Sequence, residues 1–370
     1  MIKSIELYNF KCFREQYFPI KPLTVLSGIN GVGKSSVIQS IMLARQSRQK
    51  GQEDISHLVL NGDLTHIGTS GDLLCAEAND ERGTEIELGF TSIPQPLVLR
   101  TRKEDASDTD VCEIESADIT SLVDEEPIFT DDFQYLKAER IGPRTSLPTS
   151  EYLVQQQHRI GYHGELVGQF LFTFEKAKIP ALCLQHDTES DSSIGRQTEA
   201  WLSEISPAVR LKTEGYKALD SVQMRFSYLR GREESDSFRA TNVGLGISYT
   251  LPIIVALLTP FPNSLIVLEN PECHVHPAGQ SAMGRLIACA AAAGHQVIVE
   301  THSDHILNGI RVAVMQKKLS PENVSTIYLA PNPDSLQPDV DFPQLDSRGR
   351  FDHWPNGFFD QWEKDLEQLI

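Results

Sequence analysis

Apolar and polar residues alternate near the start of the chain in the manner of β-strands. Strand-like runs occupy residues 2–8 and 16–20, and a continuous apolar run at 23–26 is typical of a buried strand. From Lys34 to about Arg48, apolar residues recur at helical spacing. The pattern predicts a strand pair, a buried strand and a helix, in that order.

The last third of the chain carries a different pattern. Residues 264–268, 296–299 and 325–329 are continuous apolar runs, which are typical of parallel strands buried on both faces. Helical spacing occupies residues 281–293 and 306–318 between them. This alternation of strands and helices predicts an α/β core with a mostly parallel sheet.

The middle of the chain is more mixed. Residues 104–132 hold twelve carboxylates and no Lys or Arg, and such a run predicts a solvated, partly disordered insertion, or in the minority view a docking surface for a basic partner. Ordered sequence resumes at Tyr135, and we expect a helical stretch to about Ala177. Residues 208–239 alternate like twisted strands.

One stretch between the buried strand and the first helix carries specific chemistry. It reads Gly28-Ile29-Asn30-Gly31-Val32-Gly33-Lys34-Ser35-Ser36 and matches the phosphate-loop pattern G-x-x-x-x-G-K-[ST] at every position. Glycines permit positive φ and a close backbone approach to a ligand, and a helix N-terminus favours phosphate. Lys34 would reach the β- and γ-phosphates, and the Ser35 hydroxyl would hold Mg²⁺. The sequence therefore predicts a nucleotide site.

Further polar residues follow the predicted strands. Glu269, Asn270 and Glu272 come after the run 264–268, where a carboxylate at a strand end can reach Mg²⁺. His302 follows the next strand and would face the γ-phosphate. A polar segment with two glycines, 241–248, precedes an apolar helix and predicts a second anion-binding helix end.

Composition narrows the class of protein. The net charge of −18 argues against a generally basic nucleic-acid-binding surface but leaves a local basic groove open. The six cysteines are scattered without a C-x-x-C pair, as expected in a reducing cytosol. No apolar run approaches the roughly 18 residues that a membrane helix needs. A cytoplasmic protein without membrane contact is expected.

Taken in order, the phosphate loop, glycine-bearing cap, strand-end carboxylate and strand-end His resemble the ATP-binding-cassette group of ATPases. Within that group, Asn30 and the blocks 269–277 and 300–305 make the chain similar to the bacterial branch related to the OLD, RecF and SMC proteins. It further resembles AAA-type ATPases with an uncharacterised C-terminal signature, here Trp354-Pro355-Asn356-Gly357-Phe358-Phe359-Asp360-Gln361.

The resemblance implies a fold and a division of the chain. The fold is an ABC-ATPase-like P-loop fold with a mostly parallel central sheet, an N-terminal antiparallel β part and a helical/β insertion. The expected parts are an N-terminal ATPase lobe (1–100), an acidic and helical insertion (101–207), a C-terminal ATPase lobe (208–335) and a small C-terminal segment (336–370).

The resemblance also implies cofactors and contacts. ATP and Mg²⁺ would lie between two copies of the chain, and the glycine-bearing cap of one copy would complete the site of the other. The nucleotide-binding residues it implies are Asn30, Gly31, Gly33, Lys34, Ser35, Ser36, Asn242, Gly244 and Gly246. Ser35 and Glu269 would hold Mg²⁺, and the catalytic group would comprise Glu269, Asn270, Glu272 and His302.

The chain departs from its relatives at the strand end. The usual Asp and Glu are here Glu269 and Asn270. An asparagine can orient water but cannot accept its proton, so general-base help, typically about 10²- to 10⁴-fold, is missing unless Glu272 supplies it. We expect an ATPase with slow hydrolysis, in which ATP acts as much as a clamp as a fuel.

Proteins of this kind often occur in bacterial defence against phage or foreign DNA, beside a separate effector such as a nuclease. The alternative is a DNA-repair or DNA-maintenance ATPase like the RecF and SMC proteins; the net charge and the lack of heptad arms stand against it. A self-sufficient nuclease is a third class, but only about 60 residues follow the His302 strand and its helix, too few for the nuclease domain that OLD-type relatives carry.

Three sets of side chains allow more than one interpretation. Arg140 and Arg144 fit arginine fingers, effector contacts or structural ion pairs. Cysteine and histidine near the strand ends suit zinc, but phosphate contact and loop shaping explain them better: Cys273, His274, His276, His302 and His305. The C-terminal aromatic residues fit a partner-binding patch or, more commonly, core packing: Trp354, Phe358, Phe359 and Trp362.

Overall fold

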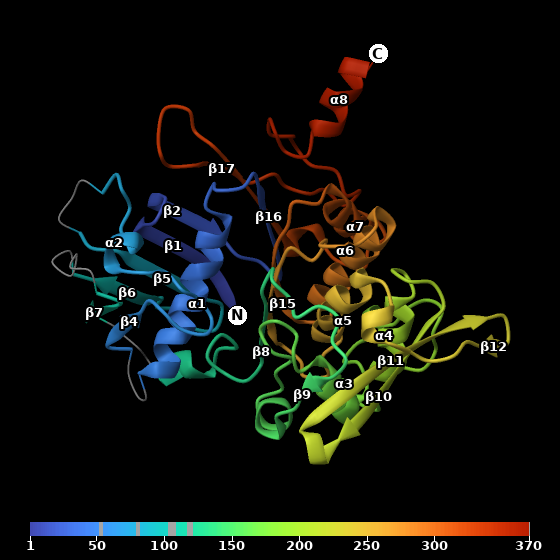
Figure 1. Cartoon of the computed structure of the whole chain (residues 1–370). Helices are drawn as coiled ribbons and strands as arrows, with labels where there is room; N and C mark the ends of the chain where they lie inside the picture. The colour runs from blue at the N-terminus through green and yellow to red at the C-terminus, as the bar shows by residue number, and fades with distance from the viewer. Residues whose placement is uncertain (52–54, 79–81, 103–108, 117–120, 370) are drawn as a thin grey trace. The chain divides into compact units, whose positions relative to one another are not determined.

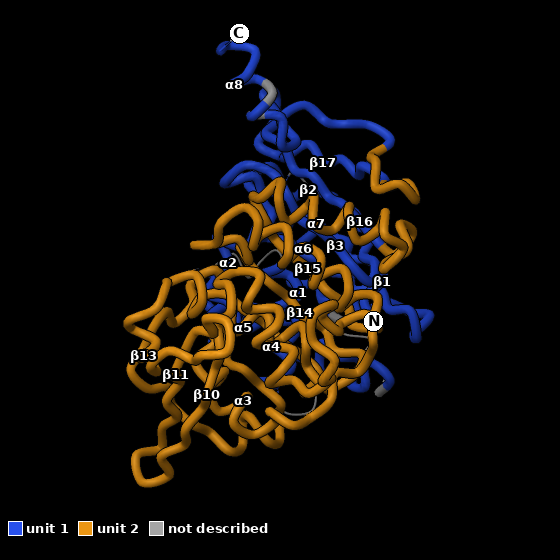
Figure 2. Tube along the Cα trace, turned by 90° about the vertical axis from the view of Figure 1, so that its right-hand side faces the viewer, with its two compact units in different colours: residues 1–130, 324–344, 352–370 blue, residues 131–323, 345–351 orange. Residues whose placement is uncertain are grey.

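The computed structural model describes residues 1–370 apart from 52–54, 79–81, 103–108, 117–120 and 370, and Figure 1 shows its elements. The chain folds into two compact units, which Figure 2 colours separately. Unit 1 contains Met1–Thr130, Val324–Gln344 and Asp352–Ile370, and unit 2 contains Asp131–Asn323 and Leu345–Phe351.

Unit 1 contains a six-stranded antiparallel sheet with the order β2-β1-β5-β6-β7-β4. Its strands are β1 (Ile2–Phe10), β2 (Phe13–Pro19), β4 (His57–Val59), β5 (Glu85–Phe90), β6 (Leu97–Thr101) and β7 (Val111–Ser116). Ile5 and Leu7 of β1 are fully buried, whereas Glu6 between them is partly exposed. The alternating pattern therefore predicts this antiparallel part correctly.

Unit 1 also holds the strand that precedes the phosphate loop. β3 (Leu23–Gly28) pairs in parallel with β16 (Val324–Ala330), and β17 (Asp339–Asp341) pairs antiparallel with β16. Both parallel strands are buried along nearly their whole length, in keeping with their continuous apolar sequences. Helix α1 (Lys34–Lys50) follows, as predicted. The other helices of unit 1 are α2 (Ser70–Leu73), the 3₁₀ turn η2 (Ser121–Glu125) and α8 (Gln361–Leu369).

The acidic stretch 104–132 differs from its prediction. Residues 103–108 and 117–120 lie outside the described residues, but β7 pairs with both β4 and β6. Cys112 and Ile128 are each 1% exposed, and in β7 Cys112 turns inward while the neighbouring carboxylate Glu113 is exposed. The described part of the stretch is therefore ordered and partly buried, whereas most of its carboxylates are exposed as expected.

Unit 2 contains a parallel three-stranded group at its core. β14 (Leu265–Glu269) lies between β8 (Phe133–Leu136) and β15 (Gln296–Glu300), with every pairing parallel. The predicted strands 264–268 and 296–299 are confirmed as β14 and β15, and the helices after them as α6 (Pro277–Ala292) and α7 (Asp304–Met315). The helix predicted after the glycine-bearing cap is α5 (Leu245–Leu257), which precedes β14. α6 and α7 meet at Gly284 and Gly309, where a Cβ would lie 2.1 and 2.2 Å from a carbonyl oxygen of the other helix.

A second sheet in unit 2 is antiparallel and is built on the hairpin that Figure 1 labels β10 and β11. Its strands are β9 (Leu147–Pro148), β10 (Val209–Tyr216), β11 (Ser221–Arg230), β12 (Glu233–Glu234) and β13 (Phe238–Arg239). Helices α3 (Val167–Phe174) and α4 (Ile194–Leu202) contact β10. The short turns of unit 2 are the π-helical η3 (Tyr152–Gln156) and the 3₁₀ turns η4 (Leu182–Leu184), η5 (Lys217–Leu219), η6 (Ala240–Asn242) and η7 (Pro321–Asn323).

The helical stretch expected up to Ala177 is mostly absent from the structure. Only the π turn and α3 are helical there. Gly161 and Gly164, between them, have φ of 89° and 76°, a left-handed conformation that a helix does not continue through. The apolar spacing of this segment reflects burial of an irregular chain rather than a helix.

His295, just before β15, is a buried histidine. It is 0% exposed, and among the described residues neither ring nitrogen has a hydrogen-bond partner. Burial lowers its pKa from 6.5 to about 4, because the imidazolium would lose its hydration. The folded protein therefore holds this ring neutral.

The buried ring predicts a loss of stability in mild acid. The unfolded chain binds the proton at a higher pH than the folded chain, so stability should fall as the pH drops from about 6.5 to 4, by about 2 kcal/mol at pH 5. Denaturant unfolding of the parent and His295→Leu at about pH 7 and pH 5 checks this. The variant should lack this part of the acid loss; equal losses in both proteins would contradict the assignment.

Candidate functional site

The phosphate loop in unit 1 is a strand-to-helix turn that depends on glycine. Gly28, Gly31 and Gly33 have φ of 142°, 82° and 101°. A Cβ on Gly28 would lie 2.2 Å from the Leu329 carbonyl oxygen, and one on Gly33 would lie 2.4 Å from the Cys12 sulfur. The loop therefore needs glycine both for its backbone conformation and for its packing.

Lys34 and the start of α1 complete this loop. The Lys34 side chain is 3% exposed, and its ammonium donates to the carbonyls of Gly28 at 3.0 Å and Ile29 at 2.6 Å. Gly33 is the N-cap of α1 and brings no side-chain acceptor. Because the first amides of a helix lack partners within it, this end suits an anion. Asn30, Gly31 and Ser35 are exposed beside it, and Ser36 is buried.

In unit 2, Glu269 ends strand β14 and is held by two donors. Oε1 accepts from the Tyr135 hydroxyl at 2.7 Å, and Oε2 accepts from the Ala138 amide at 2.9 Å. Burial, and then the nearby Glu269 charge, raise the pKa of Tyr135 well above its usual value, so the phenol remains a donor. Each oxygen of the predicted metal ligand thus already accepts one hydrogen bond.

The loop after β14 has an unusual backbone. Asn270 has φ of 44° and His274 has φ of 62°. This left-handed region is uncommon for residues other than glycine, and Asn adopts it more readily than most. The Asn270 amide donates to the Glu300 carbonyl at 2.9 Å and ties the loop to the end of β15.

Glu272 connects the same two strand ends through its side chain. Oε2 accepts from the Thr301 hydroxyl at 2.7 Å, and Oε1 accepts from the His302 amide at 2.8 Å. The Asn270 side-chain nitrogen lies 3.5 Å from Oε1. The structure therefore brings three of the four predicted catalytic residues, Asn270, Glu272 and His302, into one cluster with Thr301.

Arg140 stabilises the end of β14 through hydrogen bonds to backbone carbonyls. It is 3% exposed and donates to the carbonyls of Lys137, Glu269 and Asn270 at 3.0, 2.8 and 2.7 Å. Burial lowers the pKa of Arg140 below its usual value, although the guanidinium stays charged. The structure thus favours a structural part for Arg140, through backbone carbonyls rather than ion pairs. Arg144 is exposed.

The predicted glycine-bearing cap lies at the start of α5. Gly244 is its N-cap, with φ of −58°, and Asn242 ends the preceding 3₁₀ turn; both are exposed. A Cβ on Gly246 would lie 2.6 Å from the His274 carbonyl oxygen, so glycine lets α5 approach the loop after β14. A Cβ on Gly244 would meet open space, which leaves that helix end accessible.

The histidines near the strand ends make different contacts. His276 caps α6, since its Nδ1 accepts from the Ala278 amide at 3.4 Å. The His274 ring packs on Tyr249, and the exposed His302 is held through its backbone amide. Within the part of the chain that the structure describes, no group of three or more His, Cys, Asp or Glu could hold a metal ion.

Sequence reasoning missed Tyr135 and Thr301 as partners of the two carboxylates. Tyr135 lies on β8, whose parallel register with β14 pairs Leu136 with Leu268 and so brings it beside Glu269. Thr301 follows Glu300, which pairs with Glu269. The signal for both is strand register, which a single sequence does not contain.

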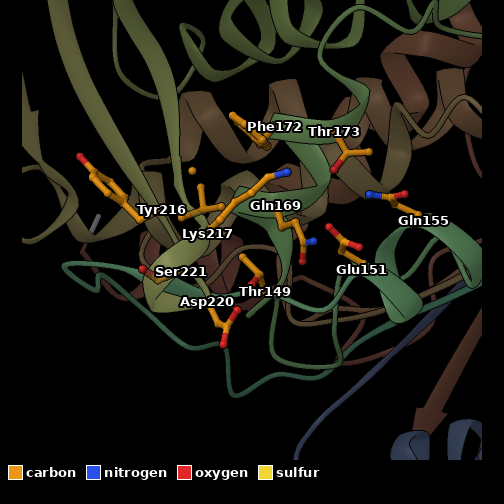
Figure 3. Close-up of a pocket in the computed structure, with 12 residues that line it drawn as sticks. Thr149, Glu151, Gln155, Gln169, Phe172, Thr173, Tyr216, Lys217, Asp220 and Ser221 are labelled. Carbon is orange, nitrogen blue, oxygen red and sulfur yellow. The ribbon is translucent and has the colours of Figure 1, made fainter.

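A cavity of about 340 Å³ lies in another part of unit 2, between the π turn, α3 and the β10–β11 turn (Figure 3). Polar side chains such as Glu151, Gln169 and Lys217 line it. Its lining comes from residues 149–173 and 215–222, whereas the residues around Glu269 and Glu272 come from 135–140 and 269–302. The cavity is thus separate from the predicted chemistry.

Comparison with protein families agrees with these features. Residues 23–308 match a family model described as "AAA domain, putative AbiEii toxin, Type IV TA system". The chain belongs to this AAA-domain family. A second model, described as "Protein of unknown function (DUF3696)", matches residues 319–369.

Two nucleases are similar in sequence to this AAA-domain protein. The Old nuclease of Escherichia phage P2 is 20% identical over 90% of this chain, and the OLD nuclease of Thermus scotoductus is 22% identical over 82%. The matches cover 63% and 59% of those proteins, so the chain spans about three fifths of their length. The chain is thus similar to OLD nucleases over most of its own length.

Solved SMC head domains share the fold. An SMC head bound to the C-winged helix domain of ScpA has a TM-score of 0.56 at 16% identity and covers 93% of this chain and 98% of its own. The head from Pyrococcus furiosus, bound to the C-terminal domain of ScpA, has a TM-score of 0.50 at 13% identity, with coverage of 100% and 99%. The expected ABC-ATPase-like α/β fold is therefore confirmed.

The C-terminal aromatic residues divide between packing and exposure. Phe358 is fully buried, and its ring lies 5.2 Å from that of Tyr328 and 5.1 Å from that of Trp354. Trp362 on α8 is 69% exposed. Core packing thus explains Phe358 but not Trp362. Of the helices described, none has the length and apolar character to cross a membrane.

Proposed function

We propose that this AAA-domain protein is an ATP-dependent switch that binds Mg-ATP at its phosphate loop. The observation that carries the proposal is the loop itself, in which three glycines at positive φ lead into the uncapped N-terminus of α1. Backbone amides at such a turn bind phosphate, and Lys34 adds a positive charge. Ser35, at the first turn of α1, is the proposed Mg²⁺ ligand from this unit.

A second copy of the chain is the proposed partner for the α5 cap. Gly244 is exposed, has no side chain, and begins a 13-residue helix, so its end suits an anion in the same way as α1. In our proposal this cap, with Asn242 and Gly246, contacts the γ-phosphate held by the other copy. ATP would then hold two or more copies together.

Hydrolysis is proposed to be slow. Asn270 cannot accept a proton from water, and within unit 2 the carboxylate of Glu269 accepts two hydrogen bonds and that of Glu272 three. Glu272 is the proposed residue that positions the attacking water, with His302 near the γ-phosphate and Glu269 near Mg²⁺. The bonds that Glu272 accepts limit it to one orientation, which favours positioning over strong base catalysis.

The proposed cellular role is control of a separate effector, such as a nuclease, in bacterial defence against phage or foreign DNA. Its support is the similarity to proteins named OLD nuclease, of which the chain spans about three fifths. In our proposal the nuclease activity resides in that separate effector, not in this chain. The purified protein should therefore not nick plasmid DNA by itself.

One observation favours a second function, direct contact with duplex DNA as in a DNA-maintenance ATPase. On the second sheet of unit 2, Lys212 lies opposite Arg225, which lies opposite Arg239. Like charges directly opposite one another destabilise a sheet, and among the described residues only Lys212 of the three forms an ion pair, with Glu214 at 2.9 Å. Such a row suits a phosphate backbone.

Replacing the phosphate-loop lysine tests the proposed ATP site. Lys34→Ala should weaken binding of a fluorescent ATP analogue by about ten- to a hundredfold, because the variant cannot form hydrogen bonds from a charged group. It should also abolish the increase in particle size that Mg-ATP causes in the parent, measured by light scattering after size exclusion. Equal binding and assembly in both proteins would rule out the proposal, as would a parent that stays monomeric in saturating Mg-ATP.

Neutralising Glu272 tests the hydrolysis step. Glu272→Gln should lower kcat by about tenfold or more with unchanged ATP affinity, because one amide oxygen cannot serve both Thr301 and His302 and position water. Phosphate release gives the rate, and Glu139→Gln, an exposed carboxylate of the same unit, is the control. Fast turnover that is insensitive to the Glu272 change would contradict both the slow rate and the role.

Removing the cationic row tests the second function. The triple variant Lys212→Gln, Arg225→Gln, Arg239→Gln should reduce the salt dependence of duplex binding, with the slope of log K against log salt falling by about 0.9 for each phosphate that the variant no longer neutralises. Fluorescence anisotropy between about 50 and 200 mM KCl measures it, with the exposed Lys176→Gln as control. No duplex binding by the parent, or an unchanged slope, would exclude this function.

A further inference from the structure

Tyr249, on the second turn of α5, lies between the Gly244 cap of that helix and the loop after β14, residues 269–274, which we call the strand-end loop. Its ring centroid is 5.6 Å from the guanidinium carbon of Arg140 and 4.6 Å from the ring of His274, which meets it edge-on at 70°. A Cβ on Gly142 would lie 3.4 Å from the Tyr249 ring, so the chain after Arg140 packs on it as well. The Tyr249 ring therefore contacts both Arg140 and His274, which hold the two ends of the loop.

Arg140 carries this contact to the strand end. The same guanidinium that lies over the Tyr249 ring donates to the carbonyls of Glu269 and Asn270 at 2.8 and 2.7 Å. These two residues begin the loop that includes Glu272. A displacement of the ring thus moves the donor that fixes the first two residues of the loop.

His274 forms the other end of the same loop. Its carbonyl faces Gly246 of α5, where only a glycine permits the approach, and its ring faces Tyr249. Between the two anchored ends, Glu272 binds Thr301 and the His302 amide. The first turns of α5 therefore contact the groups that hold the strand-end loop at both of its ends. Because closely packed groups move together, a shift of α5 should shift the loop as well.

We propose that Tyr249 and Arg140 are positioning residues that couple the α5 cap to the loop carrying Asn270 and Glu272. When an anion binds at the Gly244 cap, the position of α5 is transmitted through the Tyr249 ring to Arg140 and His274. Glu272 then takes the orientation that positions water. This inference rests on the proposed function, because it assumes that the cap receives the γ-phosphate of a second copy.

Through this coupling turnover depends on assembly, whereas binding of ATP at the phosphate loop does not require the contact between Tyr249 and Arg140. The phosphate loop belongs to unit 1, and every residue of the coupling belongs to unit 2. A chain without the Tyr249 ring should therefore bind ATP normally and still assemble, yet gain little turnover from assembly. A purely structural part for Tyr249 would instead lower stability, affinity and turnover together.

The test uses the full chain with Tyr249→Leu and the matched control Tyr249→Phe, which keeps the ring and its contacts. Phosphate release is measured over a range of protein concentrations that spans assembly, beside analogue affinity and particle size in Mg-ATP. Tyr249→Phe should behave as the parent. Tyr249→Leu should keep its affinity and assembly and show a rise in turnover per chain that is about tenfold smaller, a coupling of ordinary size.

Arg140→Lys is the second variant, for use if Tyr249→Leu does not fold. A lysine keeps the charge but cannot hold two carbonyls and lie flat on the ring, so it should show the same selective loss. Full coupling in either folded variant, the same loss in Tyr249→Phe, or a parallel fall in affinity would overturn the inference. A parent without ATP-dependent turnover would instead remove the proposed function, so the two failures are distinguishable.

Discussion

The close packing of other chain segments against the glycines of the phosphate loop is the constraint on which unit 1 depends. Gly28 lies against the Leu329 carbonyl and Gly33 against Cys12, both at positive φ. Any side chain at either position would push β16 or the turn between β1 and β2 away from the loop. The same tight packing aims the start of α1 at the loop, where amides without partners in the helix are stabilised by an anion. The glycines that this packing requires are therefore also the residues that leave the start of α1 open to the proposed phosphate.

The helix caps follow the same logic in both units. α6 and α7 begin at His276 and Ser303, whose side chains accept hydrogen bonds from the first amides of their helices. α1 and α5 begin at Gly33 and Gly244, which cannot do so. A side-chain cap would compete with a phosphate for the same amides. Glycine at these two caps therefore leaves the amides open to the proposed phosphates, without the stability that a capping side chain would add.

Local patterns predicted most of the elements, because a motif or an apolar period lies within a few residues. The phosphate loop, the buried strands and the helices after them could all be predicted in this way. The partners of the strand-end carboxylates could not, since Tyr135 is 134 residues from Glu269 and Thr301 is 29 residues from Glu272. The acidic stretch misled for a related reason: its charge is conspicuous in sequence, whereas the burial of Cys112 depends on pairing with β4 and β6.

Asn270 links the backbone of the strand-end loop to the proposed slow turnover. At φ of 44° a glutamate would be strained, whereas asparagine tolerates this conformation, so the residue that lacks a base also suits the turn. This backbone conformation lets the Asn270 amide donate to the Glu300 carbonyl. It also lets Glu272 accept hydrogen bonds from the Thr301 hydroxyl and the His302 amide. A faster base at this position would be obtained at the cost of the loop that positions Glu272. In the proposed mechanism, the departure from the usual Asp-Glu pair therefore fits a long-lived ATP-bound state rather than rapid hydrolysis.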